Sequence, residues 1–68
     1  MILIKLKELL EKNKISRYKL ERYTDLRYER INDYYYSRVK AVKLEELDKF
    51  CKVLDCKIED IIEYKKDK

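Results

Sequence analysis

Few side chains in this sequence could support catalysis. The aliphatic hydroxyls are those of Ser16, Thr24 and Ser37, the thiols are those of Cys51 and Cys56, and the 68 residues include no His. A Ser–His or Cys–His pair, in which an imidazole activates the nucleophile, is therefore impossible within one chain. Because the sequence also contains no Gly, no glycine-rich loop can surround a phosphate group. We expect no enzyme activity and no cofactor.

The two cysteines fall on apolar positions of the C-terminal half. Two thiolates without His cannot complete a four-ligand zinc site, and a single pair is little for a secreted disulfide scaffold. We expect Cys51 and Cys56 to be reduced residues in the core of a cytoplasmic protein that holds no metal. A redox role for this pair is the alternative.

Charged residues make up 47% of the chain and are unevenly distributed. Residues 1–43 carry 12 Lys or Arg and 6 Asp or Glu, a net charge of +6, whereas residues 44–68 carry a net charge of −2. No uncharged run approaches the ~20 apolar residues of a membrane-spanning helix, and the regions of a secretory signal are missing. We therefore expect no membrane partner, and we expect any polyanion to bind the N-terminal two-thirds.

Apolar residues recur at helical spacing along almost the whole chain. A chain of this length forms one domain, which spans residues 1–68. We expect a compact all-α fold of five short helices, at about 3–13, 17–23, 28–36, 44–55 and from residue 58 onward. The alternative at the two ends is a short β pairing between Met1–Ile4 and residues 61–64.

Local signals mark several helix ends. Ser16 is a typical N-cap for the second helix, and Ile15 and Leu20 flank it as a hydrophobic staple. Asn13 tolerates the left-handed conformation that ends many helices, so we expect the first helix to end there.

The segment 37–43 reads as a connecting loop, with Val39 and Val42 turned inward. The fourth helix is the most regular of the five. Its apolar face consists of Leu44, Leu47, Phe50, Cys51 and Leu54.

The second and third helices are separated by about three residues, 24–26, so residues 16–36 have the spacing of a helix-turn-helix. At 100° per residue, Ile31, Tyr34 and Tyr35 share the inward arc of the third helix. Because consecutive helical residues point in different directions, the three tyrosines 34–36 cannot form one stacking platform for bases. The outward residues are Glu29, Asn32, Asp33 and Tyr36, with Arg27 and Tyr28 at the leading end.

The segment Ile15–Leu20, followed by Thr24–Leu26 and then Ile31, resembles the helix-turn-helix core of the phage repressor and Cro family, also called the xenobiotic-response-element (XRE) family. Residues 44–56 and 58–62 resemble its fourth and fifth helices. The resemblance covers about residues 4–63. It implies a five-helix fold, a transcriptional regulator, most often a repressor, that binds double-stranded DNA, and a homodimer on a palindromic operator.

The sequence departs from the family pattern at the turn. Glu21 stands where the family usually has Ala, and Asp25 stands where it usually has Gly; Gly is also usual near Lys14 and near Ser37. Asp25 reaches positive φ with little strain. We expect Glu21 to turn toward solvent and to pair with Arg17 at i, i+4.

The outward residues of the third helix suit the reading of base edges. Asn32 can bind adenine in bidentate fashion, and Arg27 or Arg30 can bind guanine in the same way. Glu29 and Asp33 can accept a hydrogen bond from the amino group of cytosine.

Phosphate contacts are expected on both sides of this helix. The resemblance implies that the start of the second helix, with Arg17 and Tyr18, touches the DNA backbone, and a helix N-terminus also favours an anion. Loop residues Arg38, Lys40 and Lys43 add three positive charges that can bind the backbone beyond the third helix. The full set of candidate DNA-binding residues is Arg17, Tyr18, Arg27, Tyr28, Glu29, Arg30, Asn32, Asp33, Tyr36, Arg38, Lys40 and Lys43.

One small domain makes few base contacts, so we expect a homodimer on two half-sites. Ile62 and Tyr64 place its interface in the C-terminal segment, together with Met1–Ile4. The alternative function is a protein-binding module, such as an antitoxin, that binds its partner through the acidic residues 44–68.

Overall fold

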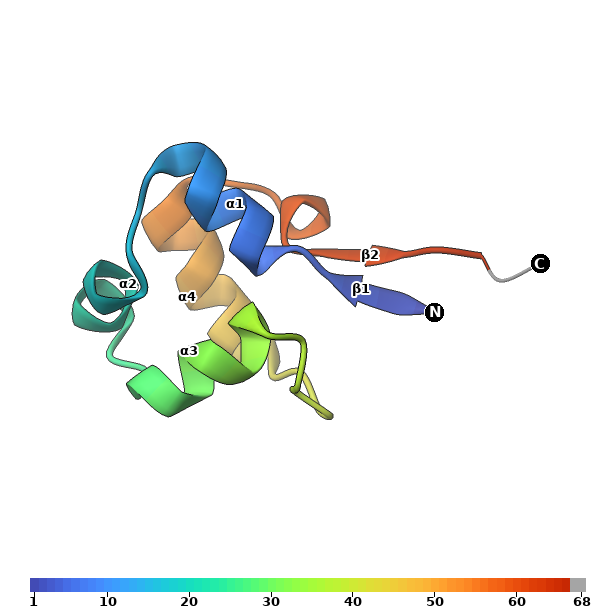
Figure 1. The fold of residues 1–68 in the computed structure, drawn as a ribbon, viewed down its shortest axis with the longest axis horizontal. Helices are drawn as coiled ribbons and strands as arrows, with labels where there is room; N and C mark the ends of the chain where they lie inside the picture. Colours follow the sequence, from blue (N-terminus) through green and yellow to red (C-terminus); the bar gives the residue numbers. More distant parts are fainter. Residues whose placement is uncertain (67–68) are drawn as a thin grey trace.

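Residues 1–66 of the computed structural model form a helical domain from which a short β ribbon projects (Figure 1). Within these residues there are four α-helices, one turn of 3-10 helix and one antiparallel pair of strands. No helix among them is long and apolar enough to cross a lipid bilayer. The elements in order are β1 (Ile2–Ile4), α1 (Leu6–Asn13), α2 (Arg17–Thr24), α3 (Tyr28–Tyr35), α4 (Leu44–Leu54), η1 (Ile58–Asp60) and β2 (Ile62–Tyr64).

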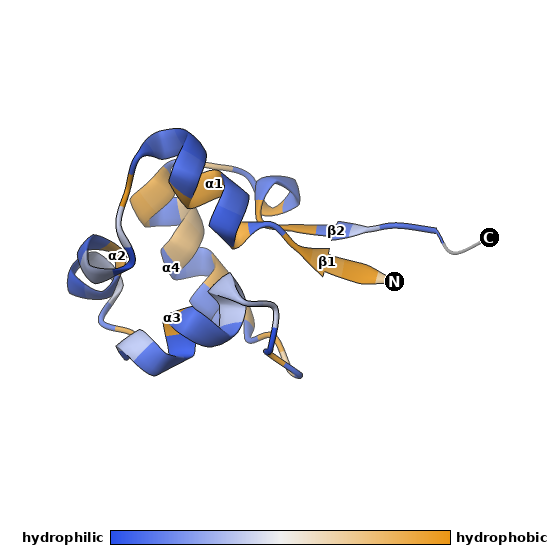
Figure 2. Cartoon of the chain, in the orientation of Figure 1, coloured by the Kyte–Doolittle hydropathy of each residue, from blue (hydrophilic) through white to orange (hydrophobic). Residues whose placement is uncertain are grey.

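The core lies between the four helices, and each contributes the apolar stripe that its sequence period predicts. The ring of Tyr34 meets that of Phe50 edge to face, with 5.1 Å between centroids. Hydrophobic residues concentrate on α4 and β1, whereas most residues of α2 and α3 are hydrophilic (Figure 2). The buried core consists of Leu6, Leu10, Leu20, Ile31, Tyr34, Leu47, Phe50, Leu54 and Ile61.

The two ends of the described chain pair as strands, which confirms the terminal β pairing. Ile2 lies opposite Tyr64, and Ile4 lies opposite Ile62. The pairing continues into the helical body, where the N–H of Lys5 donates to the carbonyl of Ile61 at 2.6 Å. An isolated two-stranded ribbon is marginal in water, so this attachment to the core holds it.

The ribbon corrects two helix predictions. The first helix begins at Leu6 rather than Leu3, because Ile2–Ile4 is used as a strand. The fifth helix is wrong as well: after one 3-10 turn the chain extends as β2. Helical spacing alone does not separate these choices, since the strand partner lies about sixty residues away in sequence.

Non-glycine residues in the left-handed region follow α1, α2, α3 and α4. They are Lys14 (φ 57°), Asp25 (φ 63°), Ser37 (φ 58°) and Asp55 (φ 50°). Asp25 is confirmed in this role. The predicted end of the first helix at Asn13 is also confirmed, but the left-handed residue is the following Lys14, and the side-chain amide of Asn13 donates to the carbonyl of Leu9 at 2.9 Å. Asp takes this conformation with little strain, whereas at Lys14 and Ser37 it costs about 1–3 kcal/mol.

The loop after α3 and the start of α4 are more exposed than predicted. Val39 packs against the core as expected, but Val42 is 38% exposed and Leu44 is 80% exposed. Leu44 is the first residue of α4, and helical side chains point toward the helix N-terminus, so it points past the end of the core.

Cys51 and Cys56 are free thiols, partly buried against the core. Burial, with a smaller effect from the neighbouring Cys51 thiol, raises the pKa of Cys56 to about 11. Cys56 is therefore protonated at neutral pH, and a protonated thiol is a poor nucleophile. Within residues 1–66, no cluster of three or more His, Cys, Asp or Glu could hold a metal ion.

Candidate nucleic-acid interface

Helices α2 and α3 and the turn between them form a helix-turn-helix at residues 17–35. Ser16 caps α2 as predicted, since its Oγ accepts from the N–H of Lys19 at 3.1 Å. The buried hydroxyl of Thr24 donates to the carbonyl of Leu20 at 2.7 Å and accepts from the N–H of Leu26 at 3.3 Å. These bonds shape the turn without a glycine.

Glu21 does not pair with Arg17, which corrects the expectation for this residue. Its Oε2 instead accepts from the backbone N–H of Tyr28, the first residue of α3, at 3.2 Å. The N-cap residue of α3 is Arg27, whose side chain has no acceptor atom with which to cap the helix. A carboxylate from α2 therefore supplies that acceptor.

The orientation of α3 agrees with the predicted helical arc. Ile31 and Tyr34 are fully buried, and Tyr35 is half-buried. On the other side, Glu29 and Tyr36 are exposed and Asn32 and Asp33 are half-buried. Arg27 is exposed at the leading end, next to the half-buried Tyr28. The outer face and the N-terminal end of α3 are thus available to a ligand.

Arg17 lies at the start of α2 and reaches across to α3. Its Nη1 donates to the side-chain oxygen of Asn32 at 2.6 Å and to the hydroxyl of Tyr36 at 3.2 Å. The guanidinium carbon lies 4.3 Å from the ring centroid of Tyr35, 5.6 Å from that of Tyr28 and 5.4 Å from that of Tyr36. We call Arg17 with Asn32 and these three tyrosines the Arg17 cluster.

The Arg17 cluster stabilises the charged form of Arg17. Although partial burial lowers the pKa of Arg17, the hydrogen bond to Tyr36 and the adjacent tyrosine hydroxyls raise that pKa overall. Next to the cluster, the ring of Tyr18 stacks on that of Tyr28 with 4.6 Å between centroids and 15° between planes. Sequence reasoning missed this arrangement. The signal in the sequence was the pair Arg17 and Tyr18 at the start of α2, together with the tyrosines of α3.

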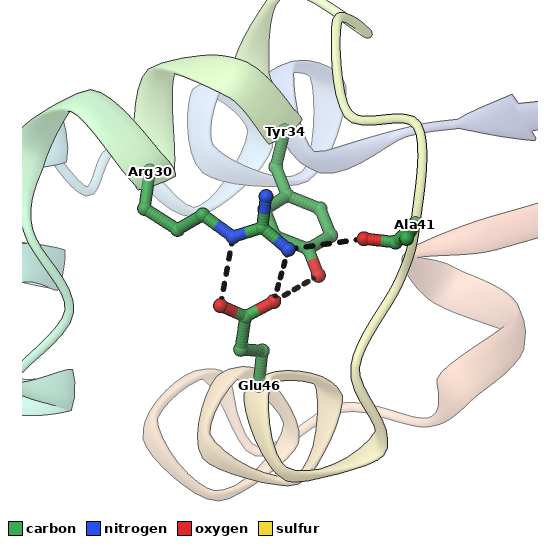
Figure 3. Close-up of polar contacts among 4 residues, drawn as sticks. All are labelled: Arg30, Tyr34, Ala41 and Glu46. Atoms are coloured by element: carbon green, nitrogen blue, oxygen red, sulfur yellow. Dashed lines mark hydrogen bonds and ion pairs between the residues drawn. The ribbon is translucent and has the colours of Figure 1, made fainter.

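Arg30 turns away from the outer face of α3 and binds α4 (Figure 3). Its Nε and Nη2 donate to the two oxygens of the Glu46 carboxylate, each at 2.8 Å. Nη2 also donates to the carbonyl of Ala41 at 3.0 Å, and the hydroxyl of Tyr34 donates to Glu46 at 2.6 Å. Arg30, which the sequence offered as a guanine reader, is occupied in holding α3 against α4.

These contacts shift the pKa values of the acidic partners. The hydrogen bonds from Arg30, opposed by burial and assisted by Tyr34, lower the pKa of Glu46. Burial, with the hydrogen bond to Glu46, raises the pKa of Tyr34 to about 12. At neutral pH the group is therefore a cation, a carboxylate and a neutral phenol, with both carboxylate oxygens satisfied.

The loop after α3 carries the predicted positive residues on its surface. Arg38, Lys40 and Lys43 are exposed. The Nε of Arg38 lies 3.4 Å from Oδ1 of Asp33, and its guanidinium lies 5.2 Å from the ring of Tyr36. Arg38 is therefore tied to the C-terminal end of α3, at the opposite end of that helix from Arg27.

The sequence-predicted residues thus separate into groups. The Arg17 cluster and Tyr18 lie between the start of α2 and the outer side of α3. Arg27 and Glu29 are exposed near the start of α3. The loop with the positive residues Arg38, Lys40 and Lys43 follows that helix. Arg30 alone is turned toward α4.

Comparison with protein families finds a match over most of the chain. The model of the Cro/C1-type HTH DNA-binding domain matches residues 5–67, which is almost the whole chain and includes the helix-turn-helix described above. The curated proteins contain no match to this sequence.

Proposed function

The chain belongs to the family of Cro/C1-type HTH DNA-binding domains, and on that premise we propose that it is a sequence-specific transcriptional regulator, acting as a repressor in the cytoplasm. The family consists of DNA-binding domains without enzymatic activity. The observation that carries the proposal is the exposure of α3: its Ile31 and Tyr34 face is buried, while its outer face and leading end are open. A helix presented in this way fits the major groove of duplex DNA.

Base contacts in this proposal come from the exposed side of α3. Arg27 and Tyr28 approach the bases first, because such helices read mainly with their N-terminal end. Asn32, Glu29 and Asp33 contact bases farther along the helix. The two carboxylates accept hydrogen bonds from the amino group of cytosine. Since carboxylates repel phosphates, they favour selective over indiscriminate binding. We leave Arg30 out of this set because Glu46 already occupies its guanidinium.

Phosphate contacts in the proposal flank α3 on both sides. Arg17 and Tyr18 lie at the N-terminus of α2, whose partial positive charge favours an anion. The Nη1 group of Arg17 is used within the protein, which leaves its other N–H groups for a phosphate. Arg38, Lys40 and Lys43 bind the backbone beyond the other end of α3.

The proposed regulator is a homodimer joined through the β ribbon. Ile2 and Tyr64 lie opposite each other and are 60% and 67% exposed, whereas Ile62 is half-buried. Each strand also has one edge outside the ribbon, and free edges invite pairing with a second chain. Sedimentation with and without DNA tests this point, and a monomer at high micromolar concentration in both cases would contradict it.

Selection of bound duplexes from a random DNA pool, at about 0.15 M salt, tests the function itself. We expect enrichment of a palindrome with two half-sites about 34 Å apart, the distance between successive major grooves on one side of the duplex. The matched control is Asn32→Ala, which should relax one base pair in each half-site and leave the others unchanged. Recovery of an unenriched pool would refute sequence-specific regulation.

A protein-binding function is the second candidate, favoured by the surface at the start of α4. There Leu44 is 80% exposed beside the exposed acidic residues Glu45 and Asp48. Such a surface suits a partner with basic and apolar residues, as an antitoxin requires for its toxin. Co-purification of a basic partner, lost on Leu44→Lys substitution, would support it.

A further inference from the structure

We infer that Arg17 orients the Asn32 amide so that Asn32 presents only hydrogen-bond donors to DNA and selects guanine instead of adenine. This inference rests on the proposed function and concerns how that same surface reads sequence. Arg17 acts as a positioning residue, since it works through Asn32.

The direction of the Asn32 amide follows from the chemistry of its partner. Nη1 of Arg17 lies 2.6 Å from Oδ1 of Asn32. A guanidinium group has five N–H donors and no acceptor, so the atom facing it must be the amide oxygen. In the described part of the chain, no protein group accepts from the Nδ2 atom of Asn32. The two N–H bonds of that amide therefore remain for a ligand.

The guanidinium that sets this direction is itself held in place. It donates to the hydroxyl of Tyr36 and lies over the ring of Tyr35 at 4.3 Å, and the ring centroids of Tyr28 and Tyr36 lie 5.6 and 5.4 Å away. The negative face of an aromatic ring attracts a cation placed over it, so these contacts restrain the guanidinium. Rotating the Asn32 amide by 180° would set N–H groups against the N–H groups of Arg17. The observed orientation is therefore the one that Asn32 carries into a complex.

The edge of guanine matches an amide that offers donors alone. Adenine presents an acceptor, N7, beside a donor, N6–H₂, and its bidentate contact needs both the oxygen and the nitrogen of an amide. Because the oxygen of Asn32 is directed at Arg17, that contact is unavailable. Guanine presents two adjacent acceptors, N7 and O6, which the Nδ2 hydrogens can approach together. This replaces the adenine contact that the residue type alone suggests.

The experiment measures binding of the full chain to four duplexes that differ at one base pair. They derive from the selected operator, and the varied position is the one at which Asn32→Ala loses its preference. We expect the wild-type protein to bind the guanine duplex about tenfold more tightly than the adenine duplex. Arg17→Met removes the donor but keeps an unbranched side chain to pack on the tyrosines. We expect it to abolish or reverse that ratio, since the amide can then rotate.

The ratio of the affinities for the guanine and adenine duplexes separates an effect on the Asn32 amide from an effect on phosphate binding. Loss of a phosphate contact by Arg17→Met weakens all four duplexes alike, so only a change in the guanine-to-adenine ratio reports on Asn32. Tyr36→Phe is the matched control: it removes one acceptor of Arg17 but leaves the contact to Asn32, and it should keep the guanine preference. Thermal unfolding of each variant shows whether it is folded.

Asn32→Asp provides an independent arm if Arg17→Met does not fold. Aspartate keeps an oxygen facing Arg17 but carries no donor, so we expect its guanine preference to vanish. A wild-type preference for adenine would overturn the inference, as would an unchanged guanine-to-adenine affinity ratio in Arg17→Met. Retained guanine preference in Asn32→Asp would also overturn it. So would an Asn32→Ala variant that keeps the wild-type preference at every base pair. If the wild-type protein selects no sequence at all, the proposed function fails first and this inference fails with it.

Discussion

The carboxylate of Glu21 in α2 accepts a hydrogen bond from the backbone N–H of Tyr28, the first residue of α3, at 3.2 Å. The first N–H groups of a helix have no partner within that helix, and they carry a partial positive charge. A side chain of the preceding helix thus takes the place of an N-cap. Because the contact joins the two helices of the helix-turn-helix, it also sets the position of the leading end of α3.

Replacement of Glu21 therefore has a local cost. We expect Glu21→Ala to lower the free energy of unfolding by about 1 kcal/mol, the usual effect of losing a helix cap. Glu21→Gln keeps an acceptor and should lose less than half of that amount. Denaturant unfolding measures both. An alanine variant as stable as the wild type would mean that water replaces the carboxylate at no cost.

Glu46 should contribute stability that is lost in acid. Its pKa in the folded protein lies below the ordinary value of 4.5, so the unfolded chain binds its proton more tightly than the folded protein does. The contribution is therefore complete above that ordinary value and is lost as pH falls through the folded pKa. We expect Glu46→Gln to lower the free energy of unfolding at pH 7 by about 2–3 kcal/mol and to flatten the acid side of the profile.

The control for Glu46 is Glu45→Gln, which makes the same change of charge on an exposed neighbour. It should leave stability within about 0.5 kcal/mol of the wild type, as most surface substitutions do. Urea unfolding between pH 3 and pH 7 follows all three proteins. If both variants have the same acid profile, the ion pair with Arg30 is not what shapes it.

Tyr34 should give the opposite dependence in alkali. Its pKa of about 12 in the folded protein exceeds the ordinary value of 10.0, so the folded state retains the proton while the unfolded chain loses it. The contribution is present below the ordinary value and is lost as pH rises through the folded pKa. Tyr34→Phe should remove this alkaline loss and cost about 1–2 kcal/mol at neutral pH. Tyr23→Phe, at an exposed tyrosine, should change neither.

The parts of the fold that depend on neighbours in sequence could be predicted. The Ser16 cap, the left-handed Asp25 and the buried face with Ile31 and Tyr34 follow from local chemistry and a period of 100° per residue, and the structure has all of them. The family resemblance rests on the same local signals, and the family match confirms it.

The remaining features depend on contacts between distant residues. Arg30 and Glu46 are 16 residues apart, and nothing in either local sequence shows that they meet. Glu21 is similar, because its partner is the backbone N–H of Tyr28. Every residue except proline has such a group, so the residue type does not indicate the contact. The Arg17 cluster likewise forms only when α2 and α3 take their mutual angle. The strands were an open alternative, since their pairing joins the two ends of the described chain.

Two apolar residues at helical spacing, one in α3 and one in α4, should differ sharply in how much their replacement by alanine lowers stability. Ile31 is fully buried, whereas Leu44 is 80% exposed. Ile31→Ala removes core volume and should cost about 2–5 kcal/mol, enough to unfold much of a domain this small. Leu44→Ala should stay within about 0.5 kcal/mol of the wild type. Equal losses at the two positions, measured by thermal unfolding, would mean that Leu44 is covered in solution.

Arg38 and Asp33 should have opposite effects on DNA affinity. Arg38 is exposed after α3, and its Nε lies 3.4 Å from Oδ1 of Asp33. If it binds a phosphate, Arg38→Ala should weaken binding to all sequences alike and reduce the slope of log affinity against log salt by about one unit. Asp33→Asn should strengthen binding to non-specific DNA, because it removes a charge that repels phosphates and partly neutralises Arg38. Titrations at several salt concentrations measure both slopes. An unchanged slope in Arg38→Ala would place the phosphate contacts on Lys40 and Lys43 instead.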